Sequence, residues 1–265
     1  IGTITMGNTE DVDIAVKAAN EAFISYSKIS KQERLSLFKK LREVTLRRYE
    51  DLARAITHEM GAPITMSRDA QTDAAIGHLD GFIAALEQHQ EKITLSNGDI
   101  LVKEPIGVCG LITPWNWPIN QIALKVIPAL ATGCTMVLKP SEIAPLSGML
   151  FAEMIHEAGF PAGVFNLVNG DGLGVGTDLS KHPDVDMVSF TGSTRAGKLI
   201  SKNASETIKR VCLELGGKGG NIVFADSYKD AVRDGIRNVM SNSGQSCDAP
   251  TRMLVEKSIY NRAVD

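Results

Sequence analysis

The sequence predicts an α/β fold built on a doubly wound parallel sheet. Short apolar runs alternate with amphipathic stretches through the middle of the chain, and strands that are apolar throughout are typical of a sheet buried on both faces. Strands that alternate with helices indicate βαβ units, whose strands pair in parallel. The expected strands cover residues 108–112, 135–138, 164–168 and 188–190, and the expected helices between them cover 120–131, 146–158 and 196–202.

Helices are expected before this sheet. Apolar side chains recur every three or four residues between residues 12 and 23, which places them on one face of a helix. Ser30 and Glu33 have the spacing of a capping box, so a second helix is expected to begin there. Gly-Ala-Pro at residues 61–63 breaks the helical pattern, and a last amphipathic stretch runs from about residue 74 toward Glu91.

Asn97-Gly98 predicts a β-hairpin, because both residues tolerate a positive φ and apolar runs flank them. This hairpin covers about residues 93–108. After the sheet, apolar runs at 222–224 and 253–256 and a helical stretch at 228–240 predict the start of a second α/β domain. We therefore expect a first domain over residues 1–217 and the incomplete start of another over 218–265.

The composition excludes several classes of protein. The chain has 265 residues, 43% of them hydrophobic, and a net charge of −3. It has neither a basic excess that indicates a nucleic-acid partner nor an apolar run long enough for a membrane span. The four cysteines lack CxxC or His-paired zinc spacing, so we expect no metal site, and they favour a reducing, cytoplasmic location over a disulfide framework.

Two glycine-containing turns are candidates for phosphate binding. The run from Gly170 to Gly176 follows an expected strand, but its spacing differs from G-x-G-x-x-G, and an ordinary strand-to-helix turn explains it at least as well. In Phe-Thr-Gly-Ser-Thr, Gly192 permits close approach, and Ser193 can cap a helix whose free N–H groups face an anion. The alternative is an N-cap turn without a ligand.

Two polar turns follow expected strands, at the edge where open α/β sheets bind ligands. Asn116, between Trp115 and Trp117, can donate its side-chain amide to a developing oxyanion, although a rigid loop with packed tryptophans explains the run equally well. Lys139 and Glu142 are a cation and a carboxylate that can hydrogen-bond to ribose hydroxyls. The alternative for this pair is a solvated charged turn.

A thiol and a carboxylate complete the candidates. Cys247 ends the run Gly-Gln-Ser-Cys, and Glu214 begins the run Glu-Leu-Gly-Gly-Lys. A nucleophile and a base are the minimum for covalent acyl chemistry. Each also has a structural explanation, because free cysteines are usually buried hydrophobic residues and a glutamate can be a paired charge at a strand end.

The order of these motifs resembles that of the NAD(P)-dependent aldehyde dehydrogenase superfamily. Pro-Trp-Asn, Lys-Pro-Ser-Glu, Phe-Thr-Gly-Ser, Glu-Leu-Gly-Gly-Lys and Gly-Gln-x-Cys follow one another as in that family, and the similarity covers essentially the whole chain. The resemblance implies a Rossmann-type cofactor-binding domain over residues 1–217, a hairpin that serves as an oligomerisation element, and the start of a catalytic domain over 218–265.

The resemblance also implies a role for each candidate. It implies Cys247 as the nucleophile, Glu214 as the base and Asn116 as the oxyanion donor. The implied cofactor contacts are Ile112, Trp115, Lys139, Glu142, Gly172, Gly176, Gly192 and Ser193.

The implied activity is oxidation of a small-molecule aldehyde to a carboxylic acid through a thiohemiacetal and a thioester on Cys247, with hydrolysis by water that Glu214 activates. NAD is the expected cofactor and NADP the alternative, because Glu142 would accept from a ribose 2′-hydroxyl and repel a 2′-phosphate, whereas Lys139 favours a phosphate. A homodimer or homotetramer is expected for the full-length protein.

Three alternatives stay open. They are a CoA-acylating relative, a non-catalytic nucleotide-binding relative, and a truncated form that binds cofactor without turnover. Glu214 favours hydrolysis over transfer to CoA, and a scaffold would need none of the three catalytic candidates. The family's Glu-x-Phe-Gly-Pro segment and carboxyl-terminal strand would follow Asp265, so we expect the chain to be the amino-terminal part of a longer protein.

Overall fold

A five-stranded parallel sheet lies at the centre of the first of two units in this computed structural model, which describes residues 2–265. The sheet order is β5-β4-β3-β6-β7, so the chain builds outward from β3 to one edge and then returns to the other side of β3. This order confirms the doubly wound sheet. The strands are β3 (Val108–Ile112), β4 (Thr135–Lys139), β5 (Phe165–Leu167), β6 (Met187–Gly192) and β7 (Arg210–Leu215).

The register aligns the carboxyl ends of the central strands. Ile112, the last residue of β3, lies opposite Lys139 on β4 and opposite Phe190 on β6. Every residue of β3 and β4 is buried, as expected for strands that are apolar throughout.

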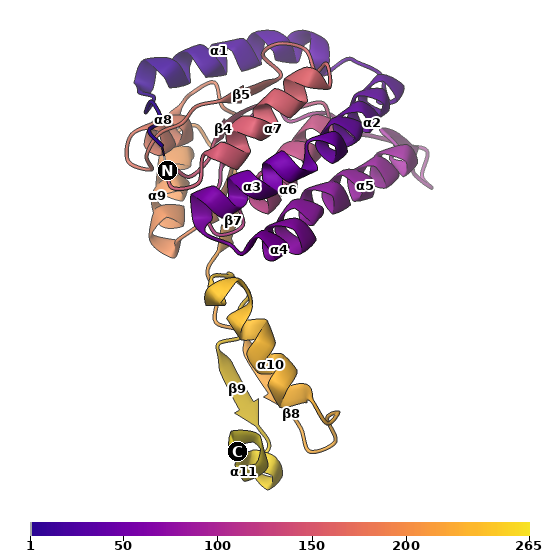
Figure 1. Ribbon diagram of the computed structural model, residues 1–265. Coiled ribbons are helices and arrows are strands. Elements are labelled where there is room, and N and C mark those ends of the chain that lie inside the picture. Colours follow the sequence, from indigo (N-terminus) through magenta and orange to yellow (C-terminus); the bar gives the residue numbers. More distant parts are fainter. Residues whose placement is uncertain (1) are drawn as a thin grey trace. The chain divides into compact units, whose positions relative to one another are not determined.

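Helices cover both faces of the sheet. α6 (Pro118–Ala131) and α7 (Leu146–Glu157) pack on one face, and α1 (Thr9–Tyr26), α8 (Val175–Lys181) and α9 (Thr194–Ser205) pack on the other (Figure 1). Outside α6 and α7 lie α2 (Lys31–Arg47), α3 (Tyr49–Met60), α4 (Ile64–Met66), the π-helix η1 (Ser67–Thr72) and α5 (Asp73–Gln88).

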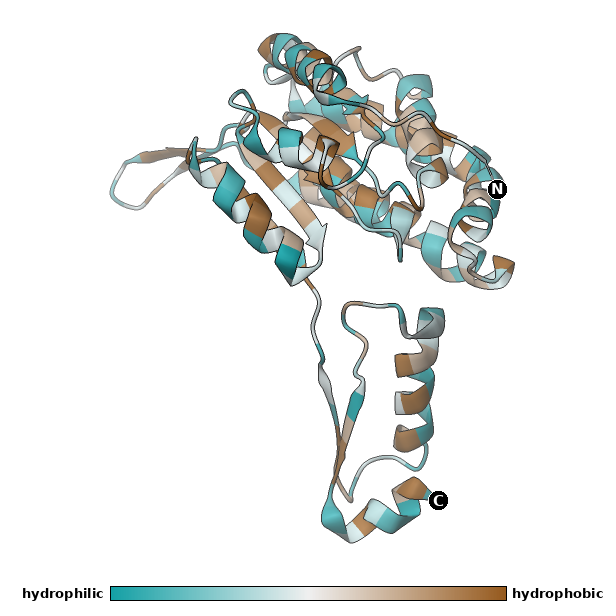
Figure 2. Ribbon diagram, turned by 90° about the vertical axis from the view of Figure 1, so that its left-hand side faces the viewer, coloured by the Kyte–Doolittle hydropathy of each residue, from teal (hydrophilic) through white to brown (hydrophobic). Residues whose placement is uncertain are grey.

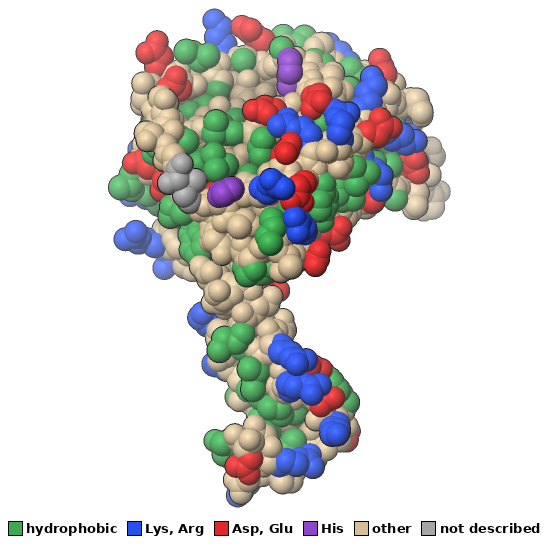
Figure 3. Space-filling model, viewed as in Figure 1, with side chains coloured by type: hydrophobic (Ala, Val, Ile, Leu, Met, Phe, Trp, Pro, Cys, Tyr) green, Lys and Arg blue, Asp and Glu red, His purple; other side chains and the backbone are tan. Residues whose placement is uncertain are grey.

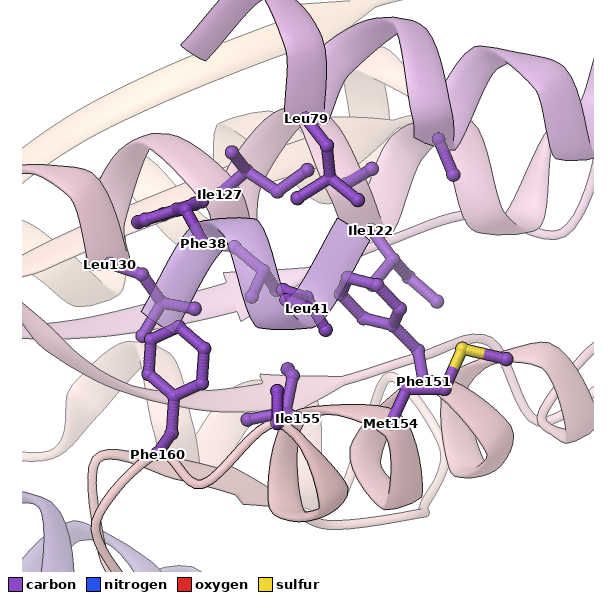
Figure 4. Packing of buried hydrophobic residues seen from close by; sticks show 14 of the residues in the cluster. Phe38, Leu41, Leu79, Ile122, Ile127, Leu130, Phe151, Met154, Ile155 and Phe160 are labelled. Carbon is purple, nitrogen blue, oxygen red and sulfur yellow. The ribbon is translucent and has the colours of Figure 1, made fainter. Parts of the chain in front are cut away.

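The main core fills the space between these helices. Figure 4 shows Leu41 of α2 beside the ring of Phe151 of α7, and Phe38 of α2 near Leu130 of α6, all of them buried. Phe160 packs edge-on against Phe38, with ring centroids 6.0 Å apart.

The predicted helix ends are confirmed. Ser30 Oγ accepts from Glu33 N at 3.2 Å, and Glu33 Oε2 accepts from Ser30 N at 2.8 Å, which is the capping box that begins α2. α3 ends before Gly61, which has a φ of +79°.

The hairpin is also confirmed. β1 (Lys92–Thr94) pairs antiparallel with β2 (Ile100–Val102), and Gly98 has a φ of +88° in the turn. Figure 2 shows the hairpin extending away from the helices, and all three residues of β2 are exposed.

The chain's contacts divide it between Glu214 and Leu215, close to the boundary expected after residue 217. The second unit contains two strands at the predicted apolar runs, β8 (Gly220–Val223) and β9 (Arg252–Val255), and they pair in parallel. Its helices are α10 (Ala231–Met240), the 3₁₀ turns η2 (Ser241–Gly244) and η3 (Lys257–Ile259), and α11 (Tyr260–Val264). α10 is shorter than expected and carries an apolar stripe along one side, with no buried residue (Figure 2).

Among the elements that escaped prediction are α8 and β7. α8 begins within the glycine-rich run, and glycine is a poor helix former, so the local sequence does not indicate a helix. β7 alternates exposed and half-buried residues and carries Arg210 and Glu214, unlike the buried apolar strands beside it. Among the described residues, no helix combines the length and apolar character needed to cross a bilayer.

A carboxylate from α3 holds the start of α7. Glu59 accepts from the backbone N–H of Leu146 at 2.5 Å and of Ser147 at 3.2 Å. Burial raises the pKa of Glu59, although the hydrogen bonds from Ser147 and Leu146 oppose the increase. On the same side, acidic and basic side chains intermingle over α2, α3 and α7 (Figure 3), and Arg48 of this group pairs with Glu153 at 2.8 Å.

We expect Glu59→Ala to lower the free energy of unfolding by about 1–3 kcal/mol, because two N–H groups lose their acceptor. The raised pKa means that the folded state binds the proton more tightly than the unfolded state. Its stabilising effect is therefore present at low pH and is lost as pH rises from the usual glutamate value through the raised pKa.

Urea unfolding across this pH range tests the assignment. The step should be absent from Glu59→Gln, whereas Glu153→Gln on the exposed surface should keep it. An unchanged step in Glu59→Gln would assign the pH dependence to another group.

Candidate active site

The carboxyl edge of the sheet gathers the predicted cofactor residues. Ile112 ends β3, Lys139 ends β4 and Gly192 ends β6, while Trp115, Asn116, Glu142, Gly172, Gly176 and Ser193 lie in the loops and first helical turns that follow β3, β4, β5 and β6. The chain leaves β3 toward β4 on one side and leaves β6 toward β7 on the other, so the strand order reverses between β3 and β6. Open α/β sheets bind ligands at such a switch point.

The loop after β3 is tied to β4. Thr113 N donates to the carbonyl oxygen of Lys139 at 3.2 Å, and Pro118 begins α6. Asn116 is half-buried between two half-buried tryptophans, in a loop at the carboxyl edge. This placement agrees with both explanations of the run, the structural one and the catalytic one.

Lys139 and Glu142 form an ion pair beside α8. Lys139 Nζ lies 3.1 Å from Glu142 Oε2, and the Lys139 side chain is only 4% exposed. A solvated charged turn is therefore wrong for Lys139. Its stem passes close to α8, because a Cβ on Gly176 would lie 3.9 Å from Lys139 Cδ, while a Cβ on Gly172 would meet no described atom within 4 Å.

Ser193 caps α9 as predicted. Its Oγ accepts from Ala196 N at 3.2 Å, and the N-terminus of a helix of this length, 12 residues, favours an anion. Gly192 has a packing reason of its own, since a Cβ there would lie 2.5 Å from Cζ of Phe190. Packing thus accounts for this glycine whether or not a ligand approaches it.

A buried lysine that the motifs did not indicate lies near Glu214. Lys125 of α6 is 7% exposed and donates from Nζ to Ser189 Oγ at 2.9 Å. Burial lowers the pKa of Lys125, and the nearby Cys212 and Glu214 oppose the decrease. Glu214 itself is exposed on β7, on the same strand face as Cys212. A single cation within the apolar sequence of α6 was the signal in the sequence.

Accessibility separates the four cysteines. Cys109 and Cys134 are buried, whereas Cys212 and Cys247 are exposed. The hydrogen bond from Cys109 lowers the pKa of Cys134, burial opposes the decrease, and Thr132 and two backbone amides add to it, but the residue is only 3% exposed. Acidity without access does not make a nucleophile for an external substrate, so Cys212 and Cys247 remain the candidates.

Within the second unit, a backbone hydrogen bond ties Cys247 to Gly217. Gly217 N donates to the carbonyl oxygen of Cys247 at 3.3 Å. Upstream, Asn242, Ser243 and Gly244 have consecutive φ values of 51°, 56° and 75°. Such a left-handed run is costly for residues other than glycine, and strained backbone clusters at functional sites.

We expect Ser243→Gly to raise the free energy of unfolding by up to about 1 kcal/mol, because glycine adopts this φ without steric cost and loses part of the gain through unfolded-chain entropy. Ser243→Val should lower it by about 1–2 kcal/mol. Thermal unfolding measures both changes.

The matched control is Ser241→Gly, since Ser241 has a φ of −56°. It should destabilise the protein, as glycine does wherever a negative φ is required. Equal shifts at both positions would show that Ser243 is not strained.

Comparison with known proteins identifies the family. The profile of the aldehyde dehydrogenase family matches residues 1–265. The 3-succinoylsemialdehyde-pyridine dehydrogenase of a Pseudomonas species is 53% identical over 260 residues, which are 97% of this chain and 54% of that protein. The chain thus spans about half the length of this relative.

Solved structures agree. An aldehyde dehydrogenase from Bartonella henselae superimposes with a TM-score of 0.97 at 58% identity, over 98% of this chain and 56% of that one. A mutant of aldehyde dehydrogenase C from Pseudomonas syringae, in complex with NAD+ and octanal, gives 0.96 at 46% identity, over 98% and 53%. Betaine aldehyde dehydrogenase from Staphylococcus aureus, in complex with NAD+, gives 0.95 at 37%, over 100% and 54%. The chain belongs to the aldehyde dehydrogenase family.

Proposed function

We propose that the complete protein containing this chain oxidises an aldehyde to a carboxylic acid with NAD. The observation that carries the proposal is the gathering of the predicted cofactor residues at the switch point of the sheet, in a chain that also has an exposed Cys247. The Pseudomonas syringae relative in complex with NAD+ and octanal supports both the cofactor and the substrate class.

The residues at the carboxyl edge fit a dinucleotide. The Lys139–Glu142 pair offers a donor and an acceptor for ribose hydroxyls, and the N-terminus of α9 offers N–H groups to a pyrophosphate. Gly176 leaves room beside Lys139, and a Cβ on Gly172 would also meet open space. Ile112 and Trp115 are the remaining proposed contacts. When bound, NAD supplies the hydride acceptor that lets the thiohemiacetal on Cys247 become a thioester.

The proposed roles of the chain's own residues follow from their chemistry. Cys247 Sγ, as thiolate, forms a bond to the carbonyl carbon, and the carbonyl oxygen becomes an oxyanion that Asn116 Nδ2 stabilises by donating a hydrogen bond. After oxidation, Glu214 takes a proton from water, whose oxygen attacks the thioester carbon. The carbon–sulfur bond then breaks, releasing the carboxylic acid and the Cys247 thiolate.

In this proposal the first unit binds the cofactor and the second begins the catalytic domain. The exposed hairpin residues Ile100, Leu101 and Val102 are the proposed oligomerisation surface of the complete protein. If CoA rather than water accepted the acyl group, an assay with CoA would yield the acyl-CoA, whereas hydrolysis yields free acid with or without CoA.

We expect Cys247→Ala to lower kcat for aldehyde oxidation by at least about 1,000-fold, because no covalent adduct forms. Glu214→Gln should retain the burst of NADH in the first turnover and slow the steady state by about 100-fold or more, because only deacylation needs the base. Stopped-flow absorbance at about 340 nm separates the two phases.

Cys212→Ala is the matched control, as the other exposed thiol, and should keep the wild-type rate. An active Cys247→Ala with an inactive Cys212→Ala would reverse the assignment.

We expect Glu142→Gln to shift the ratio of kcat/KM for NADP to that for NAD upward by about tenfold, since the carboxylate no longer repels a 2′-phosphate. Steady-state kinetics with each cofactor measures the ratio. Glu43→Gln on the exposed surface of α2 should leave it unchanged. An unaltered ratio in Glu142→Gln would show that another group sets the preference.

A further inference from the structure

Gln71 is a buried amide placed against the loop that carries Asn116. It is 0% exposed and lies in the π-helix η1. Its Nε2 donates to the main-chain oxygen of Asn116 at 3.2 Å and lies 3.3 Å from Met60 Sδ. The side chain therefore connects α3 and η1 to the residue proposed as oxyanion donor.

Packing alone does not account for an amide at this position. Among the described residues, Gln71 Oε1 has no hydrogen-bond partner although it is buried. A buried acceptor left in this way destabilises the fold, and an apolar side chain of the same size would avoid the cost. Gln71 Nε2 has two acceptors, the Asn116 carbonyl oxygen and Met60 Sδ. The bond to the carbonyl oxygen is the stronger one, because a thioether sulfur is a weak acceptor.

The π-helix and the loop both suit a positioning role. η1 packs against α3 and α6, and single π-helical turns occur often at functional sites. Pro114 and Pro118 fix their own φ and restrict the residues before them. The backbone of Trp115 and Asn116 is the part of the loop that the prolines leave adjustable, and Gln71 holds the carbonyl at the end of that part.

We infer that Gln71 is a positioning residue that holds the Asn116 peptide so that the Asn116 side chain points at the developing oxyanion. Oxyanion donors must be held within about 0.5 Å of their productive position. The inference rests on the proposed role of Asn116. Its effect is expected in the acylation step, because the Asn116 amide stabilises the oxyanion that first develops there.

A double-mutant cycle in the complete protein tests this. Gln71→Met removes the donor and keeps a side chain of similar length. We expect it to slow the NADH burst about tenfold, with KM for aldehyde and Kd for NAD changed less than about twofold. Asn116→Ala alone should slow the burst about 100-fold or more. In the Asn116→Ala background, Gln71→Met should cause no further slowing beyond about twofold, because Gln71 acts through Asn116.

Asn203→Leu is the matched control. Asn203 is a buried amide of α9 whose Nδ2 donates to Ser180 Oγ at 2.8 Å, outside the β3–α6 loop. It should lower Tm and leave the burst rate unchanged. Gln71→Leu serves as a second donor-free variant and should match Gln71→Met in burst rate.

The outcomes are distinguishable. A burst slowed equally by Gln71→Met in both backgrounds would assign Gln71 a purely structural role and overturn the inference. A normal burst in both Gln71 variants, together with a slow Asn116→Ala, would also overturn it while the proposed function stands. A normal burst in Asn116→Ala would remove the proposed oxyanion donor, and the inference with it.

Discussion

The central strand β3 is paired along both edges and buried on both faces, and the candidate residues of the first unit depend on that arrangement. Its register places Ile112 opposite Lys139 and Phe190, so the loops after three strands emerge at one level. A one-residue slip of β3 would turn each side chain to the opposite face and place a larger residue where Gly110 packs, 3.1 Å from Leu179 Cγ for an added Cβ. Cofactor residues far apart in the sequence thus share one edge because a strand of five residues is completely enclosed.

The sequence predicted the parts of the fold that depend on local patterns. Apolar runs identified β3 to β6, the Ser30–Glu33 capping box identified the start of α2, and Asn97-Gly98 identified the hairpin turn. α8 and β7 were missed because a glycine-rich start and an alternating, charged strand do not have the expected patterns. Their conformations depend on packing against distant segments, which a local pattern does not report.

The candidate site divides in the same way. Motifs named the residues at strand ends, and the structure brings those of the first unit to one edge. Burial of Lys139 and Lys125, the packing reason for Gly192 and the contact from Gln71 to Asn116 were beyond sequence reasoning. The contact from Gln71 joins residues 45 positions apart, and the Gly192 contact with Phe190 depends on how the ring folds back in three dimensions, which a local pattern does not report. The roles of Cys247, Glu214 and Asn116 in one reaction remain proposals.

The contrast between Cys134 and Cys247 bears on chemical inhibition. Cys134 is the acidified thiol, yet the sheet and helices enclose it, whereas Cys247 is exposed in a loop of the second unit. A bulky electrophile would therefore react with Cys247 rather than Cys134, because only the exposed thiol is accessible to it. Small, diffusible oxidants face no such restriction once local opening admits them. Covalent inhibitor design for this protein would gain more from shaping the scaffold around the warhead than from tuning its intrinsic reactivity.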